Sequence, residues 1–344
     1  MRLPVKGPWG LVANDASEPQ GIVLYMKNFW KNLKKPIFVI APMANVTDVA
    51  FRSMFAKYGK PDVMWTEFVS ADGLCSPGKK MLLRDLEFSK KEKPIVAQLF
   101  TSHPEKMFEA AKLVQKLGFH GIDINMGCPD RSVEKQGAGA AHIKDPETAK
   151  KVIEAARAGA PELPISVKTR IGYNKIDLSW IEFLLKLNLP VLTVHLRTRK
   201  EMSDVSAQWN LMPQIVALRD KLAPETLILG NGDVMSLEDA RKKVAESGCD
   251  GAMIGRGIFG NPWFFSGRLV SDIPPAERLK VMLEHAKAFD KLLGDVKNFA
   301  IMKKHFKAYV SGWEGAKELR VKLMETNGLA DVTKIVKDYL KVLK

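Results

Sequence analysis

The stretch GIDINMGCP, residues 121–129, is a short, mainly apolar run that ends in a glycine, a cysteine and a proline. Similar runs recur about every 20 to 35 residues, with longer segments of helical pattern between them. The runs are residues 37–43, 63–69, 94–100, 121–127, 165–171, 191–197, 227–233 and 251–257. Strands that are buried on both faces read as nearly continuous apolar runs. The repeat therefore predicts an α/β fold, a (β/α)8 TIM barrel of parallel strands.

The chain is longer than a barrel requires, since it has 344 residues and a barrel takes about 250. Residues 1–35 contain several prolines and glycines, and we interpret them as an N-terminal extension with one short amphipathic helix in residues 21–35. The barrel is expected at residues 36–272. From residue 273 to 344 no strand-like run follows, and apolar and basic residues alternate at helical spacing. This pattern predicts a small C-terminal helical domain with a basic face.

Composition narrows the possible partners. The 53 Lys and Arg residues outnumber the 39 Asp and Glu residues, which gives a net charge of +14. Such an excess favours a polyanionic partner such as nucleic acid, although a merely solvated basic surface would look the same. The sequence contains no run of about 18 apolar residues, so no membrane span is predicted. No export signal is recognised at the N-terminus.

The three cysteines lack CxxC spacing, so the sequence predicts neither a disulfide framework nor a metal site. A reducing cytoplasm is the expected location. Cys75 and Cys249 are interpreted as buried structural thiols. Cys128 differs, because Gly127 and Pro129 place it in a loop at a strand end, where barrels carry their catalytic groups.

Other strand ends also carry polar groups that a barrel core does not need. Lys168 lies within an otherwise apolar strand, so its charge requires an anionic partner, which the N1–C2=O edge of a reduced flavin would supply. Gln98 can both donate and accept, which suits the adjacent edge of the same ring. The alternatives are a buried ion pair for Lys168 and a satisfied core amide for Gln98.

The last two strands end in glycine-rich turns, GNGD at residues 230–233 and GRG at residues 255–257. Glycines let backbone N–H groups approach an anion, and the loops after strands seven and eight are the recurrent phosphate site of barrels. With Arg256 added, the two turns predict a phosphate-bearing cofactor.

These residues together resemble the tRNA-dihydrouridine synthase family. The resemblance extends in order from about residue 37 to 265. Its motifs are APMANVTD (41–48), TEFVSA (66–71), QLF (98–100), DINMGCP (123–129), VKTRIG (167–172), TVHLRT (193–198), GNGD (230–233), MIGRG (253–257) and GNPW (260–263). The resemblance implies FMN-mediated, NADPH- or NADH-dependent reduction of the C5=C6 bond of uridine in tRNA to 5,6-dihydrouridine.

The resemblance also implies a role for individual residues. Hydride would pass from flavin N5 to uracil C6, and Cys128 would protonate C5. Asn125, Lys168 and Arg170 would hold the uracil, whereas Arg197, Arg199 and the helical domain would face tRNA. The residues implied in FMN binding are Pro42, Met43, Ala44, Gln98, Lys168, His195, Asn231, Gly232, Asp233, Gly255 and Arg256.

The chain departs from the family pattern in places. Asn45 stands where the family usually has glycine, and residues 200–208 lack the usual Tyr-Ser-Gly before Trp209. Two other functions stay open: a flavin barrel that reduces a free pyrimidine, and an RNA-binding protein without turnover. The basic C-terminal region disfavours the first, and the intact Cys128 and Lys168 disfavour the second.

Overall fold

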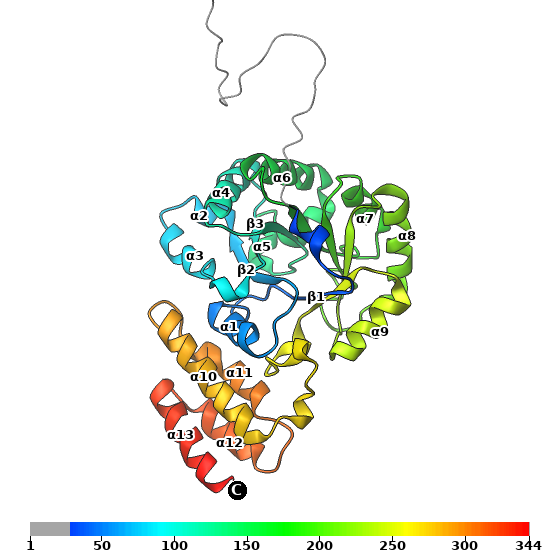
Figure 1. The fold of residues 1–344 in the computed structure, drawn as a ribbon. Helices are drawn as coiled ribbons and strands as arrows, with labels where there is room; N and C mark the ends of the chain where they lie inside the picture. The colour runs from blue at the N-terminus through cyan, green and yellow to red at the C-terminus, as the bar shows by residue number, and fades with distance from the viewer. Residues whose placement is uncertain (1–27, 344) are drawn as a thin grey trace, which may run out of the picture.

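The computed structural model describes residues 28–343, and within them eight parallel strands alternate with helices (Figure 1). The strands are β1 (Ile37–Ile40), β2 (Met64–Ser70), β3 (Ile95–Phe100), β4 (Gly121–Met126), β5 (Ile165–Arg170), β6 (Val191–His195), β7 (Leu227–Asn231) and β8 (Gly251–Ile254). Each predicted run coincides with one of these strands, although β2 extends one residue beyond its run, and the predicted barrel fold is confirmed. Several strands end two or three residues earlier than the runs, because the residues there leave the sheet and turn into the loops.

The sheet order is β1-β8-β7-β6-β5-β4-β3-β2, so the ring has its seam between β1 and β2. A parallel bridge between Val39 and Val63 crosses this seam. Asp62 supports it twice, since its backbone N–H donates to Phe38 O at 3.0 Å and its carboxylate accepts from the Phe38 N–H at 2.7 Å. Strands β1 and β2 are therefore joined over fewer residues than the other neighbouring strands of the ring.

Helices follow the strands and cover the outside of the ring. They are α1 (Val49–Tyr58), α2 (Ala71–Leu74), α3 (Lys79–Asp85), α4 (Pro104–Lys116), α5 (Arg131–Glu134), α6 (Pro146–Gly159), α7 (Leu178–Leu185), α8 (Met212–Leu222) and α9 (Leu237–Ser247). Side-chain caps start several of them: Asp48, Asp145 and Ser236 each accept a backbone N–H of the first turn. Such caps fix where each helix begins after a strand-end loop.

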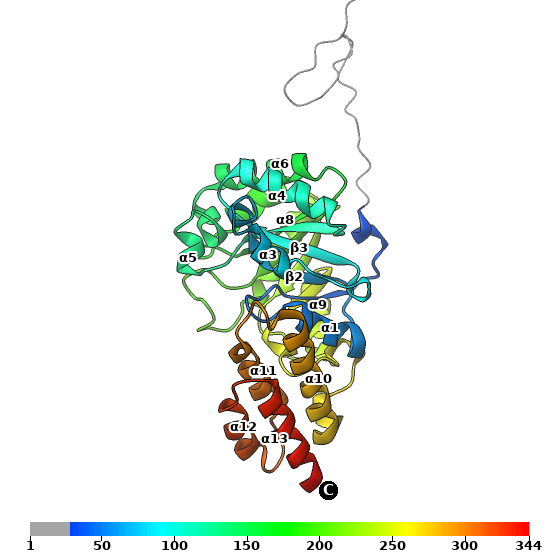
Figure 2. The ribbon, with the colours of Figure 1, turned by 90° about the vertical axis from the view of Figure 1, so that its left-hand side faces the viewer.

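Four helices after β8 form a bundle: α10 (Pro275–Leu293), α11 (Met302–Tyr309), α12 (Ala316–Met324) and α13 (Leu329–Val342). The bundle lies against α1 in both views (Figures 1 and 2). Its apolar core is continuous with Val49, Ala50 and Met54 of α1 and with Trp263. Packing of this kind fixes the bundle relative to the barrel.

The N-terminal region is described only in part. Phe29–Asn32 forms a short 3-10 helix, capped by the Asn28 side chain. Residues 1–27 of the predicted extension, which include the first part of its predicted amphipathic helix, lie outside the described residues. Among residues 28–343, no helix combines the length and apolarity that a membrane span needs.

Candidate active site

A cavity of about 330 Å³ opens at the carboxyl ends of the strands. Its lining brings together most of the residues predicted from the sequence. These are Pro42, Met43, Gln98, Asn125, Cys128, Lys168, Arg170, His195, Arg197, Asn231, Gly232, Asp233, Gly255 and Arg256. Ala44 and Arg199 lie outside the lining. The sequence motifs thus converge on one site although they span more than 200 residues of chain.

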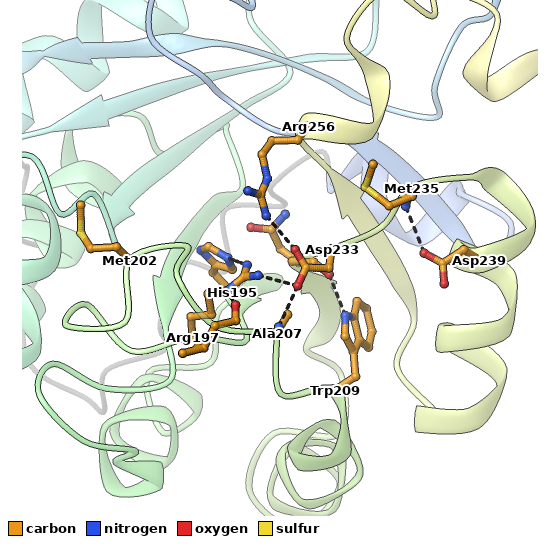
Figure 3. Close-up of polar contacts among 12 residues, drawn as sticks. His195, Arg197, Met202, Ala207, Trp209, Asp233, Met235, Asp239 and Arg256 are labelled. Carbon is orange, nitrogen blue, oxygen red and sulfur yellow. Dashed lines mark hydrogen bonds and ion pairs between the residues drawn. The ribbon is translucent and has the colours of Figure 1, made fainter. Parts of the chain in front are cut away.

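One end of the cavity carries a cluster of cations around a single carboxylate. Asp233 lies between Arg197 and Arg256 (Figure 3), and its Oδ1 accepts from Arg256 Nη2 at 2.7 Å. Its Oδ2 accepts from Arg197 Nη2 and, at 2.8 Å, from the Ala207 N–H. A carboxylate held this way orients two guanidinium groups and would repel an anion itself. The Asp233 side chain is therefore suited to positioning the arginines, with a phosphate left to them and to nearby N–H groups.

Gly232 lies at the same end and has a φ of +121°. A Cβ at this position would come within 2.7 Å of the Ala207 Cβ and 3.1 Å of the His195 ring. The Trp209 indole donates to the Gly232 carbonyl at 2.7 Å and holds the turn in place (Figure 3). The turn after β7 therefore requires glycine on two grounds, conformation and space.

His195 is neutral in this setting. Burial holds its pKa well below the ordinary value, and the charges of Lys168, Arg170, Arg197 and Arg256 lower it further. Its Nε2 accepts from Arg197 Nη1 at 3.1 Å, because a guanidinium can only donate. The ring proton therefore lies on Nδ1, which is the nitrogen left to donate.

Lys168 is a half-buried cation on the cavity wall. Burial lowers its pKa to about 8, and the charge of Arg170 adds to this effect while Asp123 opposes it. Within residues 28–343 its ammonium forms no ion pair, so the buried-pair alternative finds no support there. An anionic or strongly accepting ligand in the cavity would supply the missing partner.

Below the cavity, hydrogen bonds fix the orientation of two amides. Gln98 Nε2 donates to Asp123 Oδ2 at 2.6 Å, and Gln98 Oε1 accepts from Asn125 Nδ2 at 3.0 Å. Asn125 Oδ1 then accepts the backbone N–H of Cys128 at 2.9 Å. The chain of contacts runs from a buried carboxylate to the cysteine loop, so Asn125 holds that loop in position.

Cys128 is half-buried where this loop meets the cavity. Burial raises the pKa of its thiol, although the Asp130 N–H, Lys168 and Arg170 act in the opposite direction. The sulfur therefore keeps its proton at neutral pH and can act as an acid. Cys249 is buried as predicted, but Cys75 is exposed, so the prediction for Cys75 is wrong. It follows the short helix α2 at its C-cap, on the surface and away from the core.

Arg170 and Arg199 are largely engaged by the protein. Arg170 Nε donates to Gly127 O at 2.8 Å, and its Nη1 donates to Thr198 O and Met202 O, each at 3.0 Å. Arg199 forms a two-point ion pair with Glu134 and lies over the Tyr173 ring at 5.3 Å. Arg170 joins the loops after β4 and β6, whereas Arg199 supports the outer side of the same loops.

The sequence predictions missed part of the lining. Phe68, Gly127 and Pro129 belong to motifs that the sequence displays, so their place beside predicted residues was a usable signal. Met202, Ser203 and Met235 lie in loops without periodicity, so no sequence pattern pointed to them. The remaining lining residues are Ala41 and Val234. In the described part of the chain, no cluster of three or more His, Cys, Asp or Glu side chains could hold a metal ion.

Residues 39–344 match the family model described as dihydrouridine synthase (Dus). The probable tRNA-dihydrouridine synthase of Staphylococcus aureus (strain COL) is 40% identical over 317 residues, which cover 91% of this chain and 96% of that protein. The probable tRNA-dihydrouridine synthase 2 of Bacillus subtilis (strain 168) is 40% identical over 317 residues, 91% of this chain and 97% of that protein.

Two solved structures share the fold at low identity. Histamine dehydrogenase from Rhizobium sp. 4-9 has a TM-score of 0.50 and 13% identity, and covers 73% of this chain and 48% of that chain. The 6-hydroxypseudooxynicotine amine oxidase from Pseudomonas geniculata N1 has a TM-score of 0.51 and 10% identity, and covers 75% of this chain and 53% of that chain. These likenesses concern the barrel architecture alone.

Proposed function

Because the chain belongs to the dihydrouridine synthase family, we propose that it reduces the C5=C6 bond of uridine in tRNA to 5,6-dihydrouridine, with bound FMN and with NADPH or NADH as reductant. One observation carries the proposal. Cys128, a half-buried thiol that keeps its proton, lines the same cavity as Lys168, a cation without an ion-pair partner among residues 28–343. A proton donor and an electrophilic cation beside one cavity suit the reduction of a conjugated double bond.

The charges of the cavity residues support FMN as the cofactor. Asn231, Gly232, Gly255 and Arg256 would hold the phosphate, with Asp233 and His195 ordering that end. A Cβ added at Gly255 would meet the Met43 sulfur at 3.7 Å and the Ala41 Cβ at 3.8 Å, so this turn faces two residues of the cavity lining at ordinary contact distance. Pro42 and Met43 would lie along the ring, with Ala44 beside them outside the lining, and Gln98 and Lys168 would meet its polar edge.

When bound and reduced, FMN would supply the hydride. The residues of this chain would then act on the uracil. Lys168 and Arg170 Nη2 would stabilise the negative charge that develops on O4, and the Cys128 thiol would deliver a proton to C5. Asn125 would keep Cys128 in place through its backbone bond. Arg197 lies in the cavity wall, so Arg199 and the helical bundle are the candidates for contact with the rest of the tRNA.

The variant Cys128→Ala tests the assignment of the acid. It should bind FMN and tRNA like the parent, because alanine keeps the backbone N–H through which Asn125 holds this loop. Its rate of dihydrouridine formation should fall by about 10²- to 10⁴-fold, the usual contribution of a positioned acid. Cys75→Ala removes an exposed thiol outside the cavity and should keep the parental rate. A parental rate in Cys128→Ala would show that another group protonates C5.

The choice of substrate has its own test, in which rates are compared on transcribed tRNA and on free uracil. Turnover of uracil alone would favour a free-pyrimidine reductase. Purified protein that binds tRNA in a salt-sensitive way but lacks flavin absorbance and turnover would favour a non-catalytic RNA-binding protein. A cytoplasmic location is part of the proposal, because that is where the substrate is expected.

A further inference from the structure

Glu67 is a buried carboxylate near the end of β2 that the chemistry above does not use. Its side chain makes two contacts in opposite directions. Oε1 accepts the backbone N–H of Asn45, in the loop between β1 and α1. Oε2 pairs with Lys297 Nζ at 2.6 Å, and Lys297 comes from the loop that follows α10 in the helical bundle. Glu67 therefore joins a barrel loop to the bundle.

The loop on the barrel side forms part of the cavity. Met43 lines the cavity and Asn45 follows it two residues later, with a left-handed φ of 54°. The Met43 carbonyl accepts the N–H groups of Val46 and Thr47 at 3.1 and 3.0 Å, and its own N–H donates to Thr47 Oγ1 at 2.9 Å. These bonds make residues 43–47 one compact turn, which Glu67 anchors at Asn45.

Lys297 is held as a cation between two carboxylates. Burial alone would lower its pKa, but Glu67 and Asp85 raise it overall, and Asp85 lies 2.8 Å from the ammonium. Only 14% of the Lys297 side chain and 6% of the Glu67 side chain are exposed. Removing one partner of a buried pair leaves the other charge uncompensated, so the position of Glu67 depends on Lys297.

We propose that Lys297 is a positioning residue for the cavity. Through Glu67 it fixes the turn at residues 43–47, so the docked bundle determines the shape of the cavity wall and its affinity for FMN. The identity of the ligand rests on the proposed function. The position of the turn does not, and it can be measured without any ligand.

The matched pair of variants is Lys297→Met and Lys57→Met. Lys57 forms the exposed ion pair with Glu284, 2.6 Å long, which joins α1 to α10 away from the cavity. In the full-length apo-protein, backbone hydrogen exchange of residues 41–48 should accelerate about tenfold in Lys297→Met, because a bond to a charged group is weakened. Titration with FMN, followed by flavin fluorescence, should give a dissociation constant about tenfold higher. Lys57→Met should match the parent in both measurements, and Lys297→Arg should restore both.

Equal exchange in Lys297→Met and Lys57→Met would overturn the proposal and leave the Lys297 pair as a docking contact only. Faster exchange across the whole bundle core, and not at residues 41–48 in particular, would also overturn it. If the parent bound no FMN, the proposed function would fail while the exchange comparison still decided the role of Lys297. A parent that is active on tRNA, with a Lys297→Met variant equal to it in every readout, would reject this inference alone.

Discussion

In residues 28–343, four non-glycine residues have a positive φ: Asn45, Asn188, Met202 and Asp233. Three of them lie at or next to the cavity. Asparagine and aspartate tolerate this conformation, whereas methionine does so at a cost of about 1 to 2 kcal/mol. A charged side chain holds each of the three turns: Glu67 at Asn45, Arg170 at Met202, and Arg197 at Asp233. The strained backbone is thus concentrated where the cavity needs a defined wall.

Asp123 provides a test at the level of one carboxyl group. Burial raises its pKa from 3.8 to about 6, although bonds from Gln98 and Ser166 oppose the shift. The folded chain therefore binds more protons than the unfolded chain between these two values. The contribution is stabilising below pH about 4 and is lost as the pH rises through 6.

We expect Asp123→Asn to become more stable relative to the parent as the pH rises. Asparagine can accept from Gln98 and donate to Ser166, so the packing is kept. The difference in the free energy of unfolding should shift in favour of the variant by about 2 kcal/mol between pH 4 and pH 7, measured by urea denaturation. The control is Asp145→Asn, since bonds from Thr148 lower the pKa of this exposed cap and the shift should have the opposite sign. A pH-independent difference for Asp123→Asn would contradict the assignment.

The sequence identified the residue types at the strand ends better than their roles. Gln98, Lys168 and Cys128 were found because the end of a strand follows from the apolar pattern. The direction of each amide was not predictable, since it depends on partners such as Asp123 that lie on another strand. The engagement of Arg170 by three carbonyls could not be anticipated either, because those carbonyls belong to loops without a sequence pattern.

At the level of elements, α10 and α11 bury a pair of histidines against α1. The rings of His285 and His305 lie 4.8 Å apart, and Phe51 of α1 packs on both. None of their four ring nitrogens has a hydrogen-bond partner in the described part of the chain. Burial lowers the pKa of His285 to about 3 and holds that of His305 well below the ordinary value. The contact between helices is thus built from two neutral imidazoles.

The histidine pair should make the fold sensitive to acid. Because the folded-state pKa values are depressed, the unfolded chain binds more protons, so stability is present above pH about 6.5 and is lost as the pH falls below it.

The variant His285→Leu should unfold at a higher temperature than the parent at pH 7, by an amount equivalent to about 1 kcal/mol, because two unsatisfied nitrogens are removed. Its unfolding temperature should also fall less between pH 7 and pH 5. Scanning calorimetry at both values measures this, with the exposed His103→Gln as control, and equal pH dependence in variant and parent would refute it.

At the level of the whole molecule, the excess of positive charge extends to the end of the bundle. Lys334, Lys337 and Lys341 are exposed along α13, beside a shallow pocket between α10 and α13. Binding to nucleic acid weakens as the salt concentration rises. For single strands, each phosphate contact makes the slope of log K against log salt steeper by about 0.7.

Replacing these three lysines with glutamine should weaken tRNA binding and reduce that slope by about 2. FMN affinity should not change, since α13 supplies none of the residues that line the cavity. Filter binding at several salt concentrations measures the slope, and Lys112, Lys116 and Lys150 on the outer helices α4 and α6 offer a control triple. An equal loss in both triples would mean that only net charge matters, and that α13 is not a specific contact.

The sequence also predicted the helical character of the C-terminal region, because helical spacing of apolar residues is a local property. It did not predict that the core of the bundle includes Val49, Ala50 and Met54, which are more than 200 residues away in the chain. Such a contact depends on where α1 leaves the ring, and no local pattern records that.

The seam between β1 and β2 has a consequence for protein engineering. The helix that connects these two strands is α1, and the bundle covers its apolar face. A fragment that stops after β8 would expose this face beside the most weakly bonded joint of the ring, and it should be prone to proteolysis and aggregation. A chimaera that takes its helical bundle from a relative should therefore also take the apolar face of α1 from that relative.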